Sequence, residues 1–336
     1  MIRKLALPLL VLAALVAAGC GGASDSTSGS AAASASGGSG NRSKLSLVAY
    51  STPQVVYDEV IPAFEGTSAG KGVGFQTSYG PSGDQSRAVE AGLKADVVTF
   101  SLAPDVERLV KAGLVAPDWA GGPTKGLVST SVVALIVRKG NPKHIRGWAD
   151  LLKPGVEVVT PNPFSSGAAK WNLLGAYQHG GLDYVGRLLT KHVKVQPKSG
   201  REALQTFTGG EGDVLISYEN EAITAQKKGQ SVDYIIPADT IKIENPIAIT
   251  KTAGPAAKAF VDYALSTPAQ EKFAEWGYRP VDTAVLQANA ARFPQPHKLV
   301  TIGELGGWSK INDSLFDPDK GAIAKIENDA GVSTAK

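Results

Sequence analysis

Short apolar runs alternate with segments of helical periodicity along most of the chain. Nine runs have the length and the β-branched content of buried strands: residues 45–50, 73–78, 95–100, 132–138, 156–160, 193–196, 214–217, 234–236 and 247–250. Apolar positions at helical spacing predict helices between them, among them 85–93, 106–112, 168–177 and 256–265. This alternation predicts an α/β fold, in which parallel sheets carry helices on both faces.

Two segments predict a passage of the chain between two lobes. The strand 132–137 leads into the polar stretch 138–142, and the segment 241–249 is interrupted by Pro246. The globular part, from residue 44 to residue 336, exceeds one typical hydrophobic core. We therefore expect residues 44–138 and 246–336 to form lobe 1 and residues 139–245 to form lobe 2. A ligand cleft would lie between the lobes, and the two crossings would act as a hinge.

The N-terminus predicts the compartment of the protein. Arg3 and Lys4 precede an apolar run, 5–18, that is shorter than the roughly 20 residues needed to span a bilayer and has the length of a signal-peptide core. The run ends in small residues before Cys20, a pattern that resembles the bacterial lipoprotein signal. Residues 1–19 would then be removed and Cys20 lipidated. A plain secretory signal with an incidental cysteine is the alternative.

Composition excludes several classes of protein. Cys20 is the only cysteine, so no disulfide within the chain, no thiolate metal cluster and no catalytic cysteine is expected. Residues 20–43 are almost entirely Gly, Ser, Ala and Thr, which predicts a flexible tether. Without Arg3 and Lys4, 32 basic residues stand against 31 acidic ones. This near-neutral charge argues against nucleic acid as a partner.

Serines follow three of the predicted strands at positions that predict helix starts. Ser82 and Ser199 each precede Gln or Glu by three residues, which is the capping-box spacing, and Ser165 or Ser166 would cap the helix after strand 156–160. A helix start offers free N–H groups and the positive end of the helix dipole to an anion. Because ligands bind at the carboxyl ends of parallel strands, the pattern predicts an oxyanion cleft. It does not identify the anion, and any one serine taken alone is explained by capping.

Sequence motifs gather at the same turns and recur in order from about residue 45 to about residue 310. They are VAY at 48–50, SGDQ at 82–85, ADVVT at 95–99, VRKGNPK at 137–143, TPNP at 160–163, SSG at 165–167, WN at 171–172, GDVLI at 212–216, ENE at 219–221 and YRP at 278–280. As a set they resemble the bacterial sulfate/thiosulfate-binding proteins of ABC transporters, in their actinobacterial lipoprotein form. The resemblance implies a two-lobed periplasmic-binding-protein-like fold (type II), each lobe a mainly parallel sheet flanked by helices, with the ligand in the cleft between the lobes.

The resemblance also implies the ligand contacts, since the family binds its dianion dehydrated and through neutral donors. Ser82 and Ser166 would donate a hydroxyl and an amide each, and either Gly200 or Arg201 would donate an amide at the third helix start. Tyr218 stands where sulfate-specific members have an indole donor, so thiosulfate stays open beside sulfate. The implied ligand-binding residues are Ser51, Ser82, Ser166, Gly167, Ala168, Gly200, Arg201 and Tyr218.

Donor-only chemistry separates sulfate from phosphate. Sulfate is fully ionised near neutrality, and a buried acceptor that faces it would cost about 1–3 kcal/mol. Phosphate usually carries a proton there, which a carboxylate in the site can accept. Asp84, two residues after Ser82, is the acidic residue on which this distinction depends. We expect it to favour the helix dipole and to pair with Arg87 one turn on, and not to contact the anion.

Catalytic patterns do not accompany the predicted cleft. The four histidines lack metal-ligand spacing, and no nucleophile elbow, phosphate loop or dinucleotide fingerprint is present. We expect no catalytic residue, no metal and no cofactor.

The predicted function is therefore that of a monomeric, extracytoplasmic solute-binding lipoprotein, held on the outer face of the cell membrane by lipidated Cys20. It would capture sulfate, or thiosulfate as well, and deliver it to the permease subunits of an ABC importer. A binding protein for molybdate or phosphate is the nearest alternative. A lipid-anchored hydrolase of sulfate or phosphate esters and an adhesion or scaffold lipoprotein are more distant ones.

Overall fold

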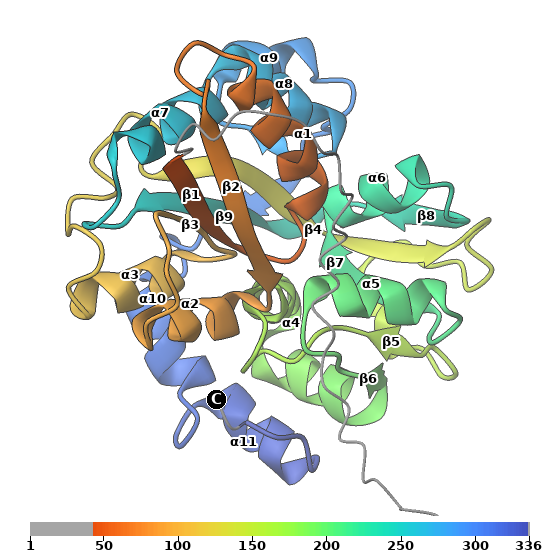
Figure 1. The fold of residues 1–336 in the computed structure, drawn as a ribbon. Coiled ribbons are helices and arrows are strands. Elements are labelled where there is room, and N and C mark those ends of the chain that lie inside the picture. The colour runs from red at the N-terminus through yellow and green to blue at the C-terminus, as the bar shows by residue number, and fades with distance from the viewer. Residues whose placement is uncertain (1–42, 335–336) are drawn as a thin grey trace, which may run out of the picture. The chain divides into compact units, whose positions relative to one another are not determined.

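The computed structural model describes residues 43–334 of the chain, in which helices lie against a β-sheet (Figure 1). The predicted signal peptide 1–19, Cys20 and the tether up to residue 42 lie outside the described residues. The described part contains eleven strands: β1 Ser43–Tyr50, β2 Val73–Gly80, β3 Val97–Thr99, β4 Leu127–Arg138, β5 Val158–Val159, β6 Val193–Val195, β7 Val214–Tyr218, β8 Val232–Ile235, β9 Asp239–Ile249, β10 Arg279–Pro280 and β11 Lys298–Val300.

Helices fill most connections between the strands, as the alternating pattern predicts. The longest of them, α4, is interrupted at Gly180 and Gly181, whose backbone angles are not helical. Among residues 43–334, no helix combines the length and the apolar character needed to cross a membrane. The helices are α1 Gln54–Glu65, α2 Ser82–Glu90, α3 Ala103–Lys111, α4 Gly167–Lys191, α5 Gly200–Thr208, α6 Glu219–Lys227, α7 Pro255–Ala264, α8 Thr267–Glu275, α9 Thr283–Ala288, α10 Gly307–Ile311 and α11 Ala322–Asp329, with a 3₁₀-helix η1 Trp148–Leu152 and a π-helical turn η2 Asn312–Phe316.

Two sets of parallel strands make up the sheet. Strand β1 pairs in parallel with β2 and β3, and β5 pairs in parallel with β6 and β7. The strand order is β2-β1-β3-β9-β4-β7-β5-β6, so that β9 and β4 stand between the two sets and pair antiparallel with their neighbours. These two antiparallel strands contain the segments that the sequence predicts as crossings.

Strands β4 and β9 join the two sets: β9 pairs with β3 of the first set, β4 pairs with β7 of the second, and the two pair with each other. Residues 129–132 of β4 pair with β9, whereas residues 133–137 pair with β7. Strand β9 pairs with β4 through residues 242–246 and with β3 through residues 247–249. Pro246 does not break β9, because its carbonyl accepts a hydrogen bond from Phe100 N at 3.2 Å and the ladder shifts register beside it at Leu127.

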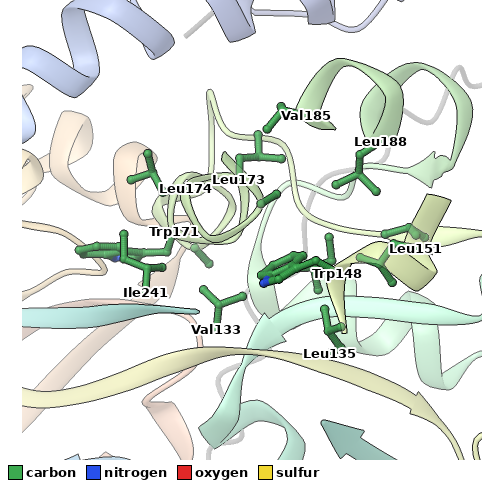
Figure 2. Packing of buried hydrophobic residues seen from close by; sticks show 14 of the residues in the cluster. Val133, Leu135, Trp148, Leu151, Trp171, Leu173, Leu174, Val185, Leu188 and Ile241 are labelled. Atoms are coloured by element: carbon green, nitrogen blue, oxygen red, sulfur yellow. The ribbon is translucent and has the colours of Figure 1, made fainter. Parts of the chain in front are cut away.

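Each set of strands has its own buried apolar cluster. Beside β1 and β2, the rings of Phe64, Phe75 and Phe260 meet edge to face with centroids 4.9 to 6.0 Å apart. Beside β4, Trp148 and Trp171 lie among the leucines of α4 (Figure 2). The paired sheet regions with their helices confirm the predicted α/β architecture.

The C-terminal helices pack on the second of these clusters. Trp308, at the start of α10, meets Trp171 of α4 with ring centroids 4.7 Å apart, and Ile323 of α11 is buried in the same cluster. The sequence assigns residues 246–336 to lobe 1, yet the end of this segment is covered by α4, which belongs to the predicted lobe 2. The apolar positions of α10, η2 and α11 are buried by this packing. The lobe boundaries themselves stay a prediction.

Candidate functional site

Three helix starts meet at one small cavity. Helices α2, α4 and α5 begin at Ser82, Gly167 and Gly200, after strands β2, β5 and β6. The cavity is small: its empty space, which includes open solvent, is about 180 Å³, and the centre of a water molecule has about 10 Å³ of it, close to the room of one water molecule. Its lining residues are Tyr50, Ser51, Thr52, Pro81, Ser82, Ser101, Ser166, Ala168, Ser199 and Gly200.

The cavity brings together five of the eight residues that the sequence predicts for ligand binding, and the other three stand next to them. Gly167 lines a neighbouring pocket, Arg201 is the next residue after Gly200, and Tyr218 is hydrogen-bonded to a residue of the lining. The five that line the cavity are Ser51, Ser82, Ser166, Ala168 and Gly200. Ser82 and Ser166 were predicted from the serines at strand ends, whereas Ser51, Ala168 and Gly200 were implied by the family resemblance.

Backbone amides at two helix starts are available to a ligand. Gly167 and Ala168 form the first turn of α4, and Gly200 and Arg201 form the first turn of α5. Their N–H groups donate to no other group in the described part of the chain. Each helix also directs the positive end of its dipole to this side, so the site has positive potential without a charged side chain in its lining.

Ser166 contributes its hydroxyl and not its amide. Its N–H donates to Asn162 O at 2.9 Å, so the predicted amide contact of Ser166 is wrong. It occupies the N-cap position of α4, but its side chain does not cap the helix, and it makes no hydrogen bond to another residue of 43–334. A buried hydroxyl without a partner at a cavity is a donor for a ligand.

The two predicted capping boxes have different outcomes. At α5, Ser199 Oγ accepts from Glu202 N at 3.1 Å, which confirms Ser199 as the N-cap, while Glu202 Oε1 accepts from the Ser199 hydroxyl at 3.1 Å and not from Ser199 N as in a full capping box. At α2 the prediction is wrong, because Pro81 is the N-cap residue and the Gln85 side chain contacts Ser78 Oγ at 3.1 Å instead. Ser82 is therefore the first residue of the helix, and its hydroxyl is directed to another partner.

That partner is the buried carboxylate of Asp105 on α3. Ser82 Oγ lies 2.6 Å from Asp105 Oδ2 and accepts a hydrogen bond from Ser101 N at 3.0 Å. Burial raises the pKa of the Asp105 carboxyl, and the Ser82 hydrogen bond and nearby cations oppose the shift. When Asp105 is ionised, the Ser82 hydroxyl donates to it. The predicted donation of this hydroxyl to a ligand competes with that bond.

Tyr218 connects to the cavity through a residue that sequence reasoning missed. Its phenol oxygen lies 2.7 Å from Ser101 Oγ, and both side chains are buried. Ser101 lines the cavity and Tyr218 does not. Ser101 directly follows the predicted strand 95–100, so the rule that found the other serines at strand ends would have found this one too.

Arg201 acts behind the cavity. Its Nη2 donates to Ser51 O at 3.2 Å and to Thr52 O at 2.9 Å, which ties α5 to the turn after β1. Its charge also acts on Glu221, whose fully buried carboxylate makes no hydrogen bond to the described residues. Burial raises the pKa of the Glu221 carboxyl, and Arg201 opposes the shift.

A second pocket adjoins the start of α4. It has about 360 Å³ of empty space and is lined by Arg87, Arg108 and Lys170, with Asp105 as its acidic side chain. Arg87 forms an ion pair with Asp84, which confirms that prediction, and Asp84 lines neither pocket. The three cations give this side of the cavity a potential that attracts anions.

The chemistry available here is the binding of a small acceptor. Four amides and a serine hydroxyl can replace part of the hydration shell of an anion, and no carboxylate is among the lining residues of the cavity. Within residues 43–334, no group of three or more His, Cys, Asp or Glu side chains could hold a metal ion.

Comparison with known proteins adds independent evidence. Residues 45–279 match the family described as bacterial extracellular solute-binding protein. The chain is 40% identical over 311 residues to the sulfate-binding protein of Synechococcus elongatus, an alignment that covers 86% of this chain and 87% of that one. It is 35% identical over 292 residues to the thiosulfate-binding protein of Pseudomonas aeruginosa, covering 80% of this chain and 88% of that one.

A solved structure extends the similarity to three dimensions. The sulfate-binding protein SubI of Mycobacterium tuberculosis superposes with a TM-score of 0.80 and 50% sequence identity. The superposition covers 82% of this chain and 100% of that one. These relatives are named for binding, two of them for the binding of sulfate and one for the binding of thiosulfate.

Proposed function

The chain belongs to the bacterial extracellular solute-binding proteins, and on this basis we propose that it captures sulfate in the cavity at the starts of α2, α4 and α5. One observation carries the proposal: the free amides of Ala168 and Gly200 and the free hydroxyl of Ser166 gather at one cavity, and the free amide of Gly167 lies beside it. Sulfate only accepts hydrogen bonds near neutrality, so a lining of donors without a carboxylate suits it.

Thiosulfate is the second ligand of the proposal. A thiosulfate-binding protein is among the relatives, and Tyr218 replaces the indole donor of sulfate-specific members with a phenol that lies outside the cavity lining. Molybdate shares the tetrahedral shape and the acceptor-only surface of sulfate. Phosphate is disfavoured, because no carboxylate in the lining could accept a hydrogen bond from its protonated oxygen.

Capture is followed by closure and delivery in this proposal. Lobe 1 (residues 44–138 and 246–336) and lobe 2 (residues 139–245) close around the anion by bending at β4 and β9, the strands that connect both parts of the sheet. Donors from both sides then replace the water around the anion. The closed protein docks on the permease of an ABC importer, where reopening releases the anion.

The lipid anchor completes the proposal. Residues 1–19 serve as a lipoprotein signal, and lipidated Cys20 holds the monomeric protein on the outer face of the membrane through the tether 20–43. Metabolic labelling with a fatty acid that carries an alkyne tests this. Label on the wild type and its loss in Cys20→Ala are expected, whereas an unlabelled wild type would indicate a plain secretory signal.

The ligand is tested by calorimetric titration near pH 7 of purified protein that has been stripped of bound anion. The titrants are sulfate, thiosulfate, molybdate and phosphate. Sulfate should bind tightly and phosphate about a thousandfold more weakly, which corresponds to about 4 kcal/mol. If phosphate binds best, or if no anion binds, the proposed ligand is wrong. Turnover of a sulfate or phosphate ester by the same sample would favour a hydrolase.

A further inference from the structure

The direction of each buried hydroxyl around the cavity can be worked out from its partners. Two buried serine side chains of the lining stand on the side of β1, β2 and β3: Ser82 at the start of α2 and Ser101 after β3. A hydroxyl has one hydrogen to donate, so only a hydroxyl that does not give it to a protein group can give it to an anion. The question is which of the two has its hydrogen left.

Ser82 has its hydrogen engaged. Its Oγ accepts from Ser101 N at 3.0 Å and lies 2.6 Å from Asp105 Oδ2. An ionised carboxylate can only accept, so the short contact with Asp105 takes the hydrogen of Ser82. The remaining side of Ser82 Oγ then presents its second lone pair, which would repel a dianion.

Ser101 is in the opposite situation because of Tyr218. Burial raises the pKa of the Tyr218 phenol well above its usual value, so the phenol keeps its hydrogen. Ser101 Oγ, at 2.7 Å, is the partner of this phenol in the described part of the chain. The phenol therefore donates, Ser101 Oγ accepts, and the hydrogen of Ser101 is left to point elsewhere.

The groups around Ser101 leave the anion site as the direction in which its hydroxyl hydrogen can point. Ser101 N donates to Ser82 Oγ, and Ser101 O accepts from Trp171 Nε1 at 2.8 Å, so the backbone of Ser101 is held on both sides. Its side chain lies against the start of α4, since a Cβ placed on Gly167 would come within 2.9 Å of Ser101 Oγ. The free amide of Gly167 is thus a neighbour of the Ser101 hydroxyl.

We infer that Ser101 is an additional anion-binding residue, and that Tyr218 positions its hydroxyl by donating to it. Tyr218 acts on the ligand through Ser101 and is not itself a ligand contact. The inference rests on the proposed function and deepens it. It also replaces the hydroxyl of Ser82, which the sequence predicts as a donor, with the hydroxyl of Ser101.

The test compares dissociation constants for sulfate, measured by calorimetry on the same anion-free preparation. Ser101→Ala should weaken binding about 10- to 100-fold, the usual effect of losing a hydrogen bond to a charged group. Ser82→Ala should weaken it less than Ser101→Ala does. Tyr218→Phe should weaken binding by about 3- to 10-fold, because Ser101 keeps its hydroxyl but loses the hydrogen bond that orients it.

A double variant separates positioning from direct contact. If Tyr218 acts through Ser101, then Tyr218→Phe should have no further effect on sulfate affinity in a protein that already carries Ser101→Ala. Independent, additive losses would contradict the positioning role. Ser131→Ala serves as a matched control, because Ser131 is a buried serine of β4 outside the cavity and should leave the dissociation constant unchanged.

The outcomes distinguish the inference from the proposed function. If the wild type binds sulfate and Ser82→Ala costs as much affinity as Ser101→Ala or more, the inference is wrong and the proposed function stands. If the wild type binds no sulfate, both are wrong. The melting temperature of each ligand-free variant shows whether a lost affinity reflects a damaged fold.

Discussion

Gly167→Ala tests whether the two sides of the cavity separate when the ligand leaves. A Cβ at Gly167 would lie 2.7 Å from Leu102 Cδ2 and 2.8 Å from Ser101 Cβ. Carbon atoms in good contact are about 3.5–4.0 Å apart, so the segments would have to move apart by about 1 Å. The backbone of Gly167 is helical, and alanine is therefore not excluded by the backbone itself.

The size of the effect follows from this overlap. Overpacking by one carbon costs typically about 1–3 kcal/mol. Ser101 and Leu102 lie in predicted lobe 1 and Gly167 lies in predicted lobe 2, so an opened protein relieves the strain and a closed one bears it. At about 1.4 kcal/mol for each factor of ten, sulfate affinity should fall about 5- to 150-fold. The ligand-free melting temperature should change little.

Calorimetry with sulfate and a thermal scan without ligand measure the two quantities. Gly186→Ala is the matched control, because it places the same Cβ on the same helix α4 with Ile326 Cδ1 3.7 Å away as its nearest neighbour. It should leave affinity unchanged. A lowered melting temperature of ligand-free Gly167→Ala with unchanged affinity would refute the reasoning, since the strain would then be present whether or not the anion is bound.

The remaining predictions concern single side chains. Ser166→Ala removes an unpaired hydroxyl from the cavity and should weaken sulfate binding about tenfold or more in the same titration. Arg279→Met leaves the buried carboxylate of Glu219 without the partner that holds it at 2.6 Å, and urea unfolding should show a loss of about 3–5 kcal/mol. Lys258→Met, which breaks an exposed ion pair, should cost about 1 kcal/mol or less by the same measurement. Burial raises the pKa of Glu221 above its usual 4.5, so the folded state holds a proton that the unfolded chain has lost, and this group lowers stability as pH rises above 4.5. In Glu221→Gln the free energy of unfolding should therefore decrease less between pH 5 and pH 7 than in the wild type. An unchanged slope would contradict the raised pKa of Glu221.

Local patterns in the sequence were sufficient for the fold class and for the turns of the site. The nine predicted strands correspond to β1 to β9, and the serines at their ends lead into α2, α4 and α5. The capping box of Ser199 and Glu202 was predictable because both groups lie within one turn of the same helix. The interpretation of Pro246 as an interruption was too simple, since a neighbouring strand uses its carbonyl.

Strand and helix periods, helix starts and the small residues that leave amides exposed depend on groups a few residues apart, so they could be predicted from the sequence. Where each hydroxyl donates became clear only from the packing of distant segments. Ser82 and Asp105 are 23 residues apart, and Ser101 and Tyr218 are 117 residues apart, so no local rule relates them. A hydroxyl donates one hydrogen, and the partner that receives it is set by packing between distant segments. The order of the turns predicts the serines at the starts of α2, α4 and α5, and their neighbours in space determine what each one offers at the cavity.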